Sequence, residues 1–305
     1  MNKSIKTEIA FTLIELLVVI AIIGILSALI VVGMNETTES ANIAKSKVFS
    51  NSLRNNLALN IVGEWKFEGP TGAGQTVTTL DLQDSWGGHN SNIVINGTPI
   101  VKGGSDCVVG KCLIFNSSTD YVTCGNGGTT DLSVSSGDSL TIEVWVNINT
   151  LGRSHAIVSQ WRPWIFFITT ANKLNLYIRS NGGDISASAN TALISNKWYH
   201  AAVVYTKANR TATFYLNGKS DGAPVFATEM DSLTTGRVQV GGYGNLSNLL
   251  SGKVDDFRIY NTAIPTSQIQ QNYFAGLNKM FAGNQINQIE YNQRITELVN
   301  NYAKE

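Results

Sequence analysis

An uncharged run near the N-terminus constrains this chain more than any other feature. From Leu16 to Met34 the only polar residue is Ser27. As an α-helix this run would be roughly 28 Å long, close to the hydrocarbon thickness of a bilayer. A cleavable secretory signal would have a shorter apolar region and a small-x-small cleavage site. Because Lys3 and Lys6 precede the run, we expect the N-terminal tail to stay in the cytoplasm. The sequence therefore predicts a single-pass membrane helix over about residues 12–34, with the remainder exported.

Glu15 lies just inside this apolar segment. A carboxylate there is costly unless it has a partner, which makes it a functional candidate. The residues around it, Ala10-Phe11-Thr12-Leu13-Ile14-Glu15, closely resemble the processing site of type IV prepilins and pseudopilins. In that family a membrane peptidase cleaves before the Phe and methylates the new amino group. The resemblance implies cleavage between Ala10 and Phe11. It also implies that Glu15 neutralises the Phe11 ammonium of a neighbouring subunit, since a buried charge is tolerated only as part of a pair.

This resemblance also indicates the subunit type and its partners. Ala10 stands where the family usually has Gly, and the Pro that often kinks major-pilin helices is missing. The missing Pro favours a minor pilin or pseudopilin. The implied partners are other pilin or pseudopilin subunits, the prepilin peptidase, the inner-membrane assembly platform and the lipid bilayer. The implied location is the cytoplasmic membrane, and after assembly a filament at the cell surface. A plain membrane anchor is the alternative.

After Met34 the pattern becomes amphipathic. Apolar residues recur mostly three to five positions apart, at Ile43, Ala44, Val48, Leu53, Leu57 and Ile61. No Pro or Gly interrupts the run before Gly63. We therefore expect a leader over residues 1–10 and one long helix over residues 11–62.

From Gly63 to about Thr262 the apolar period changes to two. In three segments apolar residues alternate with polar or aromatic ones: Ile142 to Ile148, Leu174 to Ile178, and Ala212 to Leu216. The third segment stops at the turn sequence Asn217-Gly218. Such strands with turns between them predict an antiparallel β-sandwich over residues 63–262. The chain as a whole is expected to be of the α+β class, with short helices in a C-terminal extension over residues 263–305.

Several segments of the head resemble the concanavalin A-like, laminin-G-like jelly roll, and they occur in that family's order. They are Gly63–Phe67, Asp84–Gly88, Leu113–Phe115, Leu140–Trp145, Asn196–His200, Phe214–Gly218 and Leu250–Tyr260. Jelly rolls of this family are chiefly binding modules for sugars or proteins, and many hold Ca²⁺. The resemblance therefore implies a glycan or a surface protein as the ligand of the head.

Oxygen-rich turns around Asp84 and Asp255 are candidates for binding Ca²⁺, which prefers oxygen ligands. In the alternative interpretation, Asp84 opens a turn and Asp255 is a strand or loop residue that contacts backbone or solvent. No compact Asp-rich loop of the EF-hand type is present.

Three tryptophans near loops or strand ends, Trp86, Trp161 and Trp164, are candidates for stacking on a sugar ring. Tryptophan also fills sandwich cores, and for Trp161 and Trp164 that alternative stays open. The remaining three, Trp65, Trp145 and Trp198, are interpreted as packing residues.

The sequence does not favour catalysis. Glucanases of the jelly-roll fold place several carboxylates close together on one strand. The strand Thr141–Ile148 has only Glu143, and the three histidines are scattered without metal-like spacing. Lys and Arg total 22, as do Asp and Glu, so no overall positive charge favours nucleic acid. We expect a protein that is not an enzyme and does not bind nucleic acid.

Three cysteines fit an exported chain with one disulfide. Cys107 and Cys112 flank a tight hairpin and would face each other across its strands. Cys124 would then be a buried thiol. Pairing of Cys112 with Cys124 is the alternative.

The C-terminal extension shows two helical patterns, separated by Gly283-Asn284. The first runs from about Ser267 to Phe281. The second places its apolar residues largely on one face: Ile286, Ile289, Ile295, Leu298 and Tyr302.

Together these features predict a minor pilin or pseudopilin with a jelly-roll binding head. The alternatives are a structural pseudopilin of a type II secretion system without ligand binding, and a membrane-tethered glycan hydrolase.

Overall fold

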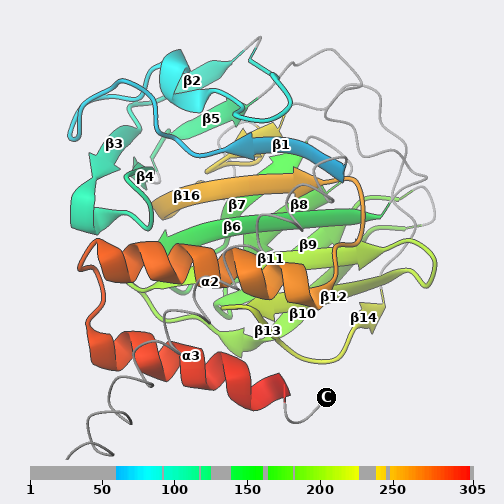
Figure 1. Cartoon of the computed structure of the whole chain (residues 1–305). Coiled ribbons are helices and arrows are strands. Elements are labelled where there is room, and N and C mark those ends of the chain that lie inside the picture. The colour runs from blue at the N-terminus through cyan, green and yellow to red at the C-terminus, as the bar shows by residue number, and fades with distance from the viewer. Residues whose placement is uncertain are drawn as a thin grey trace, which may run out of the picture. The chain divides into compact units, whose positions relative to one another are not determined.

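The computed structural model describes residues 60–90, 93–116, 118–124, 139–160, 164–180, 183–226, 238–244 and 248–302 (Figure 1). The predicted leader, most of the predicted long helix and the predicted membrane segment lie outside these residues, as do Ala10, Phe11 and Glu15. The predicted end of the long helix at residue 62 is wrong, because strand β1 begins at Ile61, which pairs with Tyr260. Within the described part of the chain, no helix is long and apolar enough to span a bilayer.

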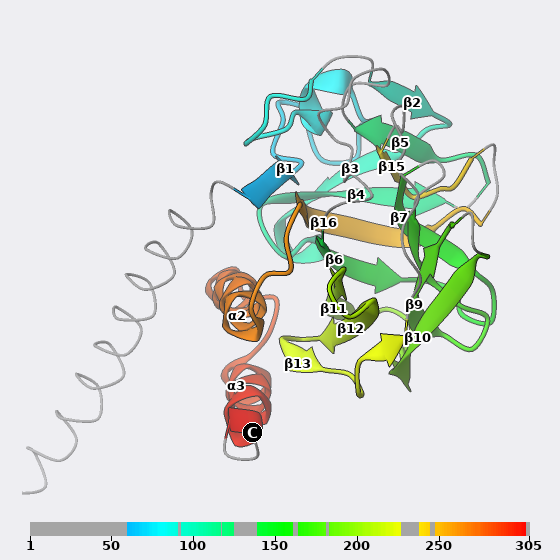
Figure 2. The same ribbon diagram turned by 90° about the vertical axis from the view of Figure 1, so that its right-hand side faces the viewer.

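Two antiparallel sheets form the head (Figure 2). In the first sheet the strand order is β13 (Lys219–Ser220), β12 (Thr211–Leu216), β11 (Trp198–Thr206), β6 (Leu140–Ile148), β16 (Ser251–Tyr260), β4 (Lys111–Asn116) and β3 (Ile100–Gly103). Two further strands pair outside this order, β1 (Ile61–Trp65) with β16 and β14 (Val225–Phe226) with β12.

In the second sheet the strand order is β10 (Ile185–Ala192), β9 (Lys173–Ile178), β8 (Trp164–Ile168), β7 (His155–Gln160), β15 (Val238–Val240), β5 (Tyr121–Cys124) and β2 (Val94–Asn96). Two short 3₁₀ helices, η2 (Thr79–Leu82) and η3 (Gly104–Asp106), lie in the connections. The observed architecture confirms the predicted antiparallel sandwich.

The core between the sheets follows from the period-two pattern. Because successive side chains of a strand point to opposite faces, every second residue of β6 enters this core. Ile142, Val144 and Val146 are fully buried there, together with Leu174 and Leu176 of β9. The alternation therefore predicted the inner face of both strands correctly.

The turn Asn217-Gly218 joins β12 to β13, as its sequence predicts. Asn217 and Gly218 have φ values of 52° and 75°. Asn and Gly adopt this left-handed conformation at the lowest cost, and two such residues in a row give a hairpin turn that matches the twist of the strands. The turn packs against the C-terminal helices, because a Cβ on Gly218 would lie 3.0 Å from atoms of both Tyr273 and Leu298.

Two helices, α2 (Thr266–Ala282) and α3 (Gln288–Tyr302), form the C-terminal extension. They pack on the outer face of the first sheet, where Trp145 and Trp198 meet Tyr273 and Leu277 of α2 in a second apolar cluster. Both helices and the break at Gly283 were predicted from the sequence.

One detail of α3 differs from the prediction. Ile289 is 79% exposed. The buried stripe of α3 instead runs through Tyr291, Arg294 and Leu298, with Ile295 partly buried beside it. These residues are three or four positions apart and so share one face of a helix. Ile289 is nine positions from Leu298, which places it on the opposite face.

Candidate functional site

The loop after η2 presents a partly exposed aromatic ring. Trp86 is 41% exposed, and its loop is organised by the buried carboxylate of Asp84. Asp84 Oδ1 accepts hydrogen bonds from the backbone N–H groups of Glu64 and Trp86, both at 2.9 Å. Its Oδ2 accepts from the backbone N–H of Gly87 at 3.0 Å and lies 2.6 Å from His89 Nδ1.

These bonds fix the backbone on both sides of Trp86. The contact with Glu64 anchors the loop to strand β1, and Ser85 N–H donates to the Glu64 carbonyl at 2.7 Å. A flat ring held in place by a fixed backbone loses little conformational freedom when a ligand covers it. The loop 84–90 therefore offers a preorganised surface for stacking.

The other two candidate tryptophans differ from Trp86. Trp164 lies in the sandwich core with 1% of its surface exposed, so the interpretation of Trp164 as a ligand-stacking residue is wrong. It begins strand β8, where the alternating pattern points its side chain inward. Trp161 lies outside the described residues. Trp65, Trp145 and Trp198 are buried, as predicted.

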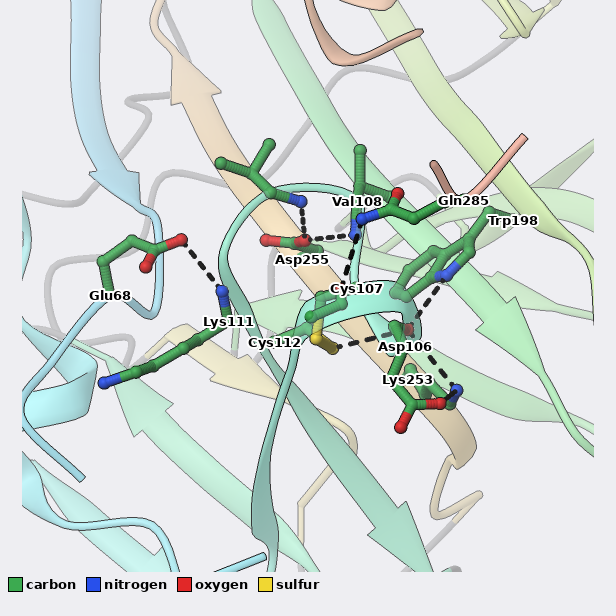
Figure 3. The surroundings of a disulfide bond; sticks show 12 residues. Glu68, Asp106, Cys107, Val108, Lys111, Cys112, Trp198, Lys253, Asp255 and Gln285 are labelled. Carbon is green, nitrogen blue, oxygen red and sulfur yellow. Dashed lines mark hydrogen bonds and ion pairs between the residues drawn. A yellow bond between two sulfur atoms is a disulfide. The ribbon is translucent and has the colours of Figure 1, made fainter. Parts of the chain in front are cut away.

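The predicted disulfide between Cys107 and Cys112 is present (Figure 3). Its Cα–Cα distance is 5.4 Å, and Cys124 is a buried free thiol. The bond lies in the loop of the β3–β4 hairpin, within the second apolar cluster. Cys107 follows η3 and Cys112 in β4 pairs with Lys102, so the prediction that the two cysteines face each other across the strands of a tight hairpin is wrong. The side chain of Asp255 points at this hairpin.

Asp255 is fully buried, and its Oδ2 accepts hydrogen bonds from the backbone N–H groups of Val108 and Val109, both at 2.9 Å. Its Oδ1 has no hydrogen-bond partner among the described residues. Burial and the nearby Asp256 carboxylate raise the pKa of Asp255 well above its usual range. A β-bulge between Asp255 and Arg258 directs both side chains to the outer face, with Asp256 in the left-handed region at φ 45°.

The calcium prediction gains no support from these contacts. The carboxylates of Asp84 and Asp255 accept hydrogen bonds from N–H groups. Asp84 thereby holds the loop 84–90 in place, and Asp255 holds the loop between β3 and β4. Among the residues that the structure describes, no group of three or more His, Cys, Asp or Glu is placed to hold a metal ion. Calcium binding at Asp84 and Asp255 stays a prediction.

A buried polar cluster that the sequence analysis did not identify lies under α2. Glu143 of β6 is fully buried, and its Oε2 accepts a hydrogen bond of 2.6 Å from Asn272 Nδ2 of α2. Its Oε1 lies 3.9 Å from Nε2 of His200, which is also buried. Burial raises the pKa of Glu143 to about 7 and lowers the pKa of His200 to about 3.

Next to Glu143 lies a salt-bridge network on the same face. Arg258 Nε is 2.8 Å from Glu64 Oε1, and Arg258 Nη2 is 2.8 Å from Asp256 Oδ1. Burial acts to raise the pKa of Glu64, but Arg258 and Lys66 outweigh it and lower this pKa to about 2. The opposed charges keep this covered face electrically balanced.

One sequence signal could have revealed the cluster. Glu143 and Trp145 share the face of β6 that points away from the core. A large aromatic residue on that face indicates that something covers it, and the C-terminal helices were the available cover. Because α2 covers Glu143, a substrate has no access to it in this structure.

Comparison with known proteins agrees with this architecture. The sequence profile of the concanavalin A-like lectin/glucanases superfamily matches residues 116–270, just over half of the chain. The chain belongs to this superfamily. A second profile, the prokaryotic N-terminal methylation motif, matches residues 6–31. The type IV pilin-like N-terminal segment and the jelly-roll head predicted from the sequence are both confirmed. No curated protein matches the sequence.

Solved structures share the fold of the head. The binding domain of Paraclostridial Mosquitocidal Protein 1 matches with a TM-score of 0.53 and 17% identity, covering 73% of this chain and 53% of that one. Domain 4 of AbnA, an extracellular arabinanase from Geobacillus stearothermophilus, in complex with arabinotriose, has a TM-score of 0.53 and 17% identity, covering 69% and 97%. The binding domain of Botulinum Neurotoxin DC in complex with SialylT has a TM-score of 0.54 and 12% identity, covering 72% and 52%. The chain thus spans about half the length of the toxin domains that it matches.

Proposed function

We propose that this chain is a minor pilin or pseudopilin subunit whose head binds carbohydrate outside the cytoplasmic membrane. One observation carries the proposal: the methylation motif at residues 6–31 and a lectin-superfamily head occur in the same chain. The motif supports membrane insertion and assembly with other subunits, and the head supports ligand capture. Solved structures of similar fold were determined with arabinotriose and with SialylT, which favours a sugar as the ligand.

Binding is proposed in preference to catalysis. Glycoside hydrolysis requires two carboxyl groups at a defined separation around the scissile bond. Glu143, the only carboxylate of strand β6, is buried beneath α2. Trp86, in contrast, is half-exposed on a fixed loop. A membrane-tethered hydrolase and a structural pseudopilin without a ligand are the competing functions.

The processing step is tested by the intact mass of the chain recovered from membranes. We expect a mature protein that begins at Phe11 and carries one N-methyl group. A chain that still begins at Met1 would contradict the pilin assignment.

Assembly is tested by replacing Glu15 with Ala. The variant should still insert into the membrane, because the change makes the segment more apolar. It should fail to enter filaments, because the Phe11 ammonium loses its partner. Glu36→Ala, which removes a carboxylate beyond the apolar run, is the matched control. Filament incorporation of Glu15→Ala at the level of the control would refute this role.

Ligand capture is tested on a glycan array with the full chain in a detergent that has no sugar headgroup. We expect binding to a defined set of glycans, reduced about fivefold or more by Trp86→Ala, if stacking on the indole contributes as much as the roughly 1–3 kcal/mol of a nucleic-acid base on an aromatic side chain. Ile194→Ala removes another exposed apolar side chain, 58% exposed in a different loop, and serves as the control. Release of reducing sugar would instead support the hydrolase, and an array without any signal would support the structural pseudopilin.

A further inference from the structure

A pocket of about 190 Å³ opens where the β12–β13 hairpin meets the C-terminal helices. Its lining comes from four parts of the chain: β10 supplies Thr191, the hairpin region supplies Lys219 and Asp221, and α2 and α3 supply Tyr273 and Arg294 respectively. Figure 1 shows β13 beside these helices, far from the loop between η2 and β2. The pocket is therefore separate from the Trp86 loop.

The walls of the pocket are held in place. Asp221 accepts hydrogen bonds from the backbone N–H of Thr191 at 3.1 Å and from its hydroxyl at 2.6 Å, which ties the hairpin to β10. Arg294 is 7% exposed and donates from Nη2 to Glu290 Oε1 at 2.7 Å. Tyr273 is 1% exposed and packs against the hairpin turn. A pocket with walls fixed in this way needs little reorganisation to bind a ligand.

The charges of the pocket cancel. Lys219 and Arg294 contribute two positive side chains, and Asp221 and Glu297 contribute two carboxylates. A ligand with a net charge would therefore meet attraction and repulsion in equal number. A neutral ligand that both donates and accepts hydrogen bonds would find partners of both kinds.

The pocket has hydrogen-bond donors and acceptors that the described residues do not fully use. No hydrogen bond or ion pair engages the ammonium group of Lys219 among the described residues, and the Nη1 of Arg294 is a buried donor without a partner there. On the acceptor side, Glu297 is exposed and its Oε1 accepts only from Gln293 in the described part of the chain, at 3.1 Å.

We infer that this pocket is a subsite for one ring of a neutral saccharide, formed jointly by the β12–β13 hairpin and the C-terminal helices. Sugar hydroxyls each donate and accept, which matches a lining of balanced charge. The volume is below the roughly 300 Å³ at which sites for drug-sized ligands begin, so it suits a single ring rather than an oligosaccharide. This inference rests on the proposed function and adds a second place of contact to the Trp86 loop.

The test uses the full chain in a detergent without a sugar headgroup. Glucose, galactose, N-acetylglucosamine and arabinose are titrated and followed by saturation-transfer NMR and calorimetry, with glucuronic acid as the charged comparator. We expect one or more of the neutral sugars to bind, and glucuronic acid to bind no more tightly than glucose. Tighter binding of the acid would overturn the assignment of a neutral ligand.

Two variants locate the binding. The double variant Lys219→Gln and Glu297→Gln keeps the net charge and should weaken binding at least about tenfold, because hydrogen bonds to charged groups are the strong ones. Ser220→Trp, on the exposed rim, should block entry. Lys279→Gln, an exposed residue of α2 outside the pocket, is the matched control. Thermal melting of each variant confirms that it is folded.

The outcomes separate the pocket from the proposed function. If both pocket variants bind like the control while Trp86→Ala abolishes binding, the pocket inference is overturned and carbohydrate recognition by the head stands. If the unmodified chain binds no saccharide in this panel or on the array, both are overturned.

Discussion

The two faces of strand β6 are both buried, but they are built from different chemistry. The inner face presents Ile142, Val144 and Val146 to the sandwich core. The outer face presents Glu143 and Trp145 to the C-terminal helices. The inner face is stabilised by burial of apolar surface, which does not require one particular partner for each side chain. The outer face is stabilised by paired polar groups, and loss of one partner leaves the other buried without a hydrogen bond, which lowers the free energy of unfolding. The comparison shows that burial alone does not tell how a surface responds to mutation or pH.

The largest effect is expected on the inner side. Phe257 is fully buried and its ring stacks on Trp65, with 5.0 Å between ring centroids. Phe257→Ala should lower the free energy of unfolding by about 3–5 kcal/mol, because it removes apolar burial and leaves a cavity. Chemical denaturation of the full chain in detergent measures this, with Phe257→Leu as the milder control. A loss below about 1 kcal/mol would show that the core repacks.

A slightly smaller effect is expected for the charge network of the outer face. Arg258→Met removes the buried guanidinium from Glu64 and Asp256, leaves Glu64 with only Lys66 as a charged partner, and should cost about 3 kcal/mol. Adding Glu64→Gln removes the stranded charge, and the double variant should recover part of the loss. If the double variant is less stable than Arg258→Met alone, the network does not behave as a coupled pair.

The inner face of β6 could be predicted from the sequence, whereas the polar cluster of the outer face could not. The inner face followed from the alternation of Ile142, Val144 and Val146, because burial on one side of a strand imposes a period of two. The hairpin turn, both helices and the disulfide followed from equally local signals.

The outer-face cluster did not follow from local signals. Its contacts join Glu143 to Asn272 and Glu64 to Arg258, positions that are 129 and 194 residues apart. Only the register of the sheet and the docking of α2 bring them together. The same reason explains why the pocket beside Arg294 was not predicted. The sequence left Trp164 open between stacking on a sugar and packing in the core, because a tryptophan at the start of a strand has the same local sequence whether it points inward or outward.

The disulfide on the outer side should contribute less to the free energy of unfolding than Phe257 in the core or the salt bridges of Arg258. It closes a loop with a sequence separation of 5, for which the chain-entropy estimate is about 2 kcal/mol. Replacing Cys107 and Cys112 with Ala should therefore cost about that amount. Cys124→Ala, which removes the buried free thiol, is the control for a lost sulfur atom. Thiol counting under denaturing, non-reducing conditions should find one free cysteine in the unmodified chain.

The smallest net effect is expected in the pH dependence of the outer face, because Glu143 and His200 contribute with opposite sign. Because the pKa of Glu143 rises from 4.5 to about 7 on folding, its proton-linked stabilisation is complete below pH 4.5 and lost as the pH rises through about 7. Because the pKa of His200 falls from 6.5 to about 3, its contribution is present above pH 6.5 and lost as the pH falls toward 3. Between pH 4.5 and 6.5 the two contributions oppose each other.

Single variants should separate these contributions. Relative to the unmodified chain, Glu143→Gln should gain stability as the pH rises from 4.5 to 7, by more than about 1 kcal/mol. His200→Gln should gain relative stability as the pH falls below 6.5. Denaturation midpoints measured at several pH values test both trends. Curves that run parallel to that of the unmodified chain would show that neither group changes its pKa on folding.

The position of β16 within the first sheet has a consequence for when the head can fold. β16 is the last strand in the chain, yet it pairs with β6 on one side and with β4 and β1 on the other. Until β16 is available, the early strands β1, β3 and β4 cannot join the sheet that contains β6. Such long-range closure is slow, and it leaves strand edges unpaired in the meantime. A head of this design cannot complete its first sheet until β16 has been made, and until then the open edges of β4 and β6 are exposed to pairing with other chains.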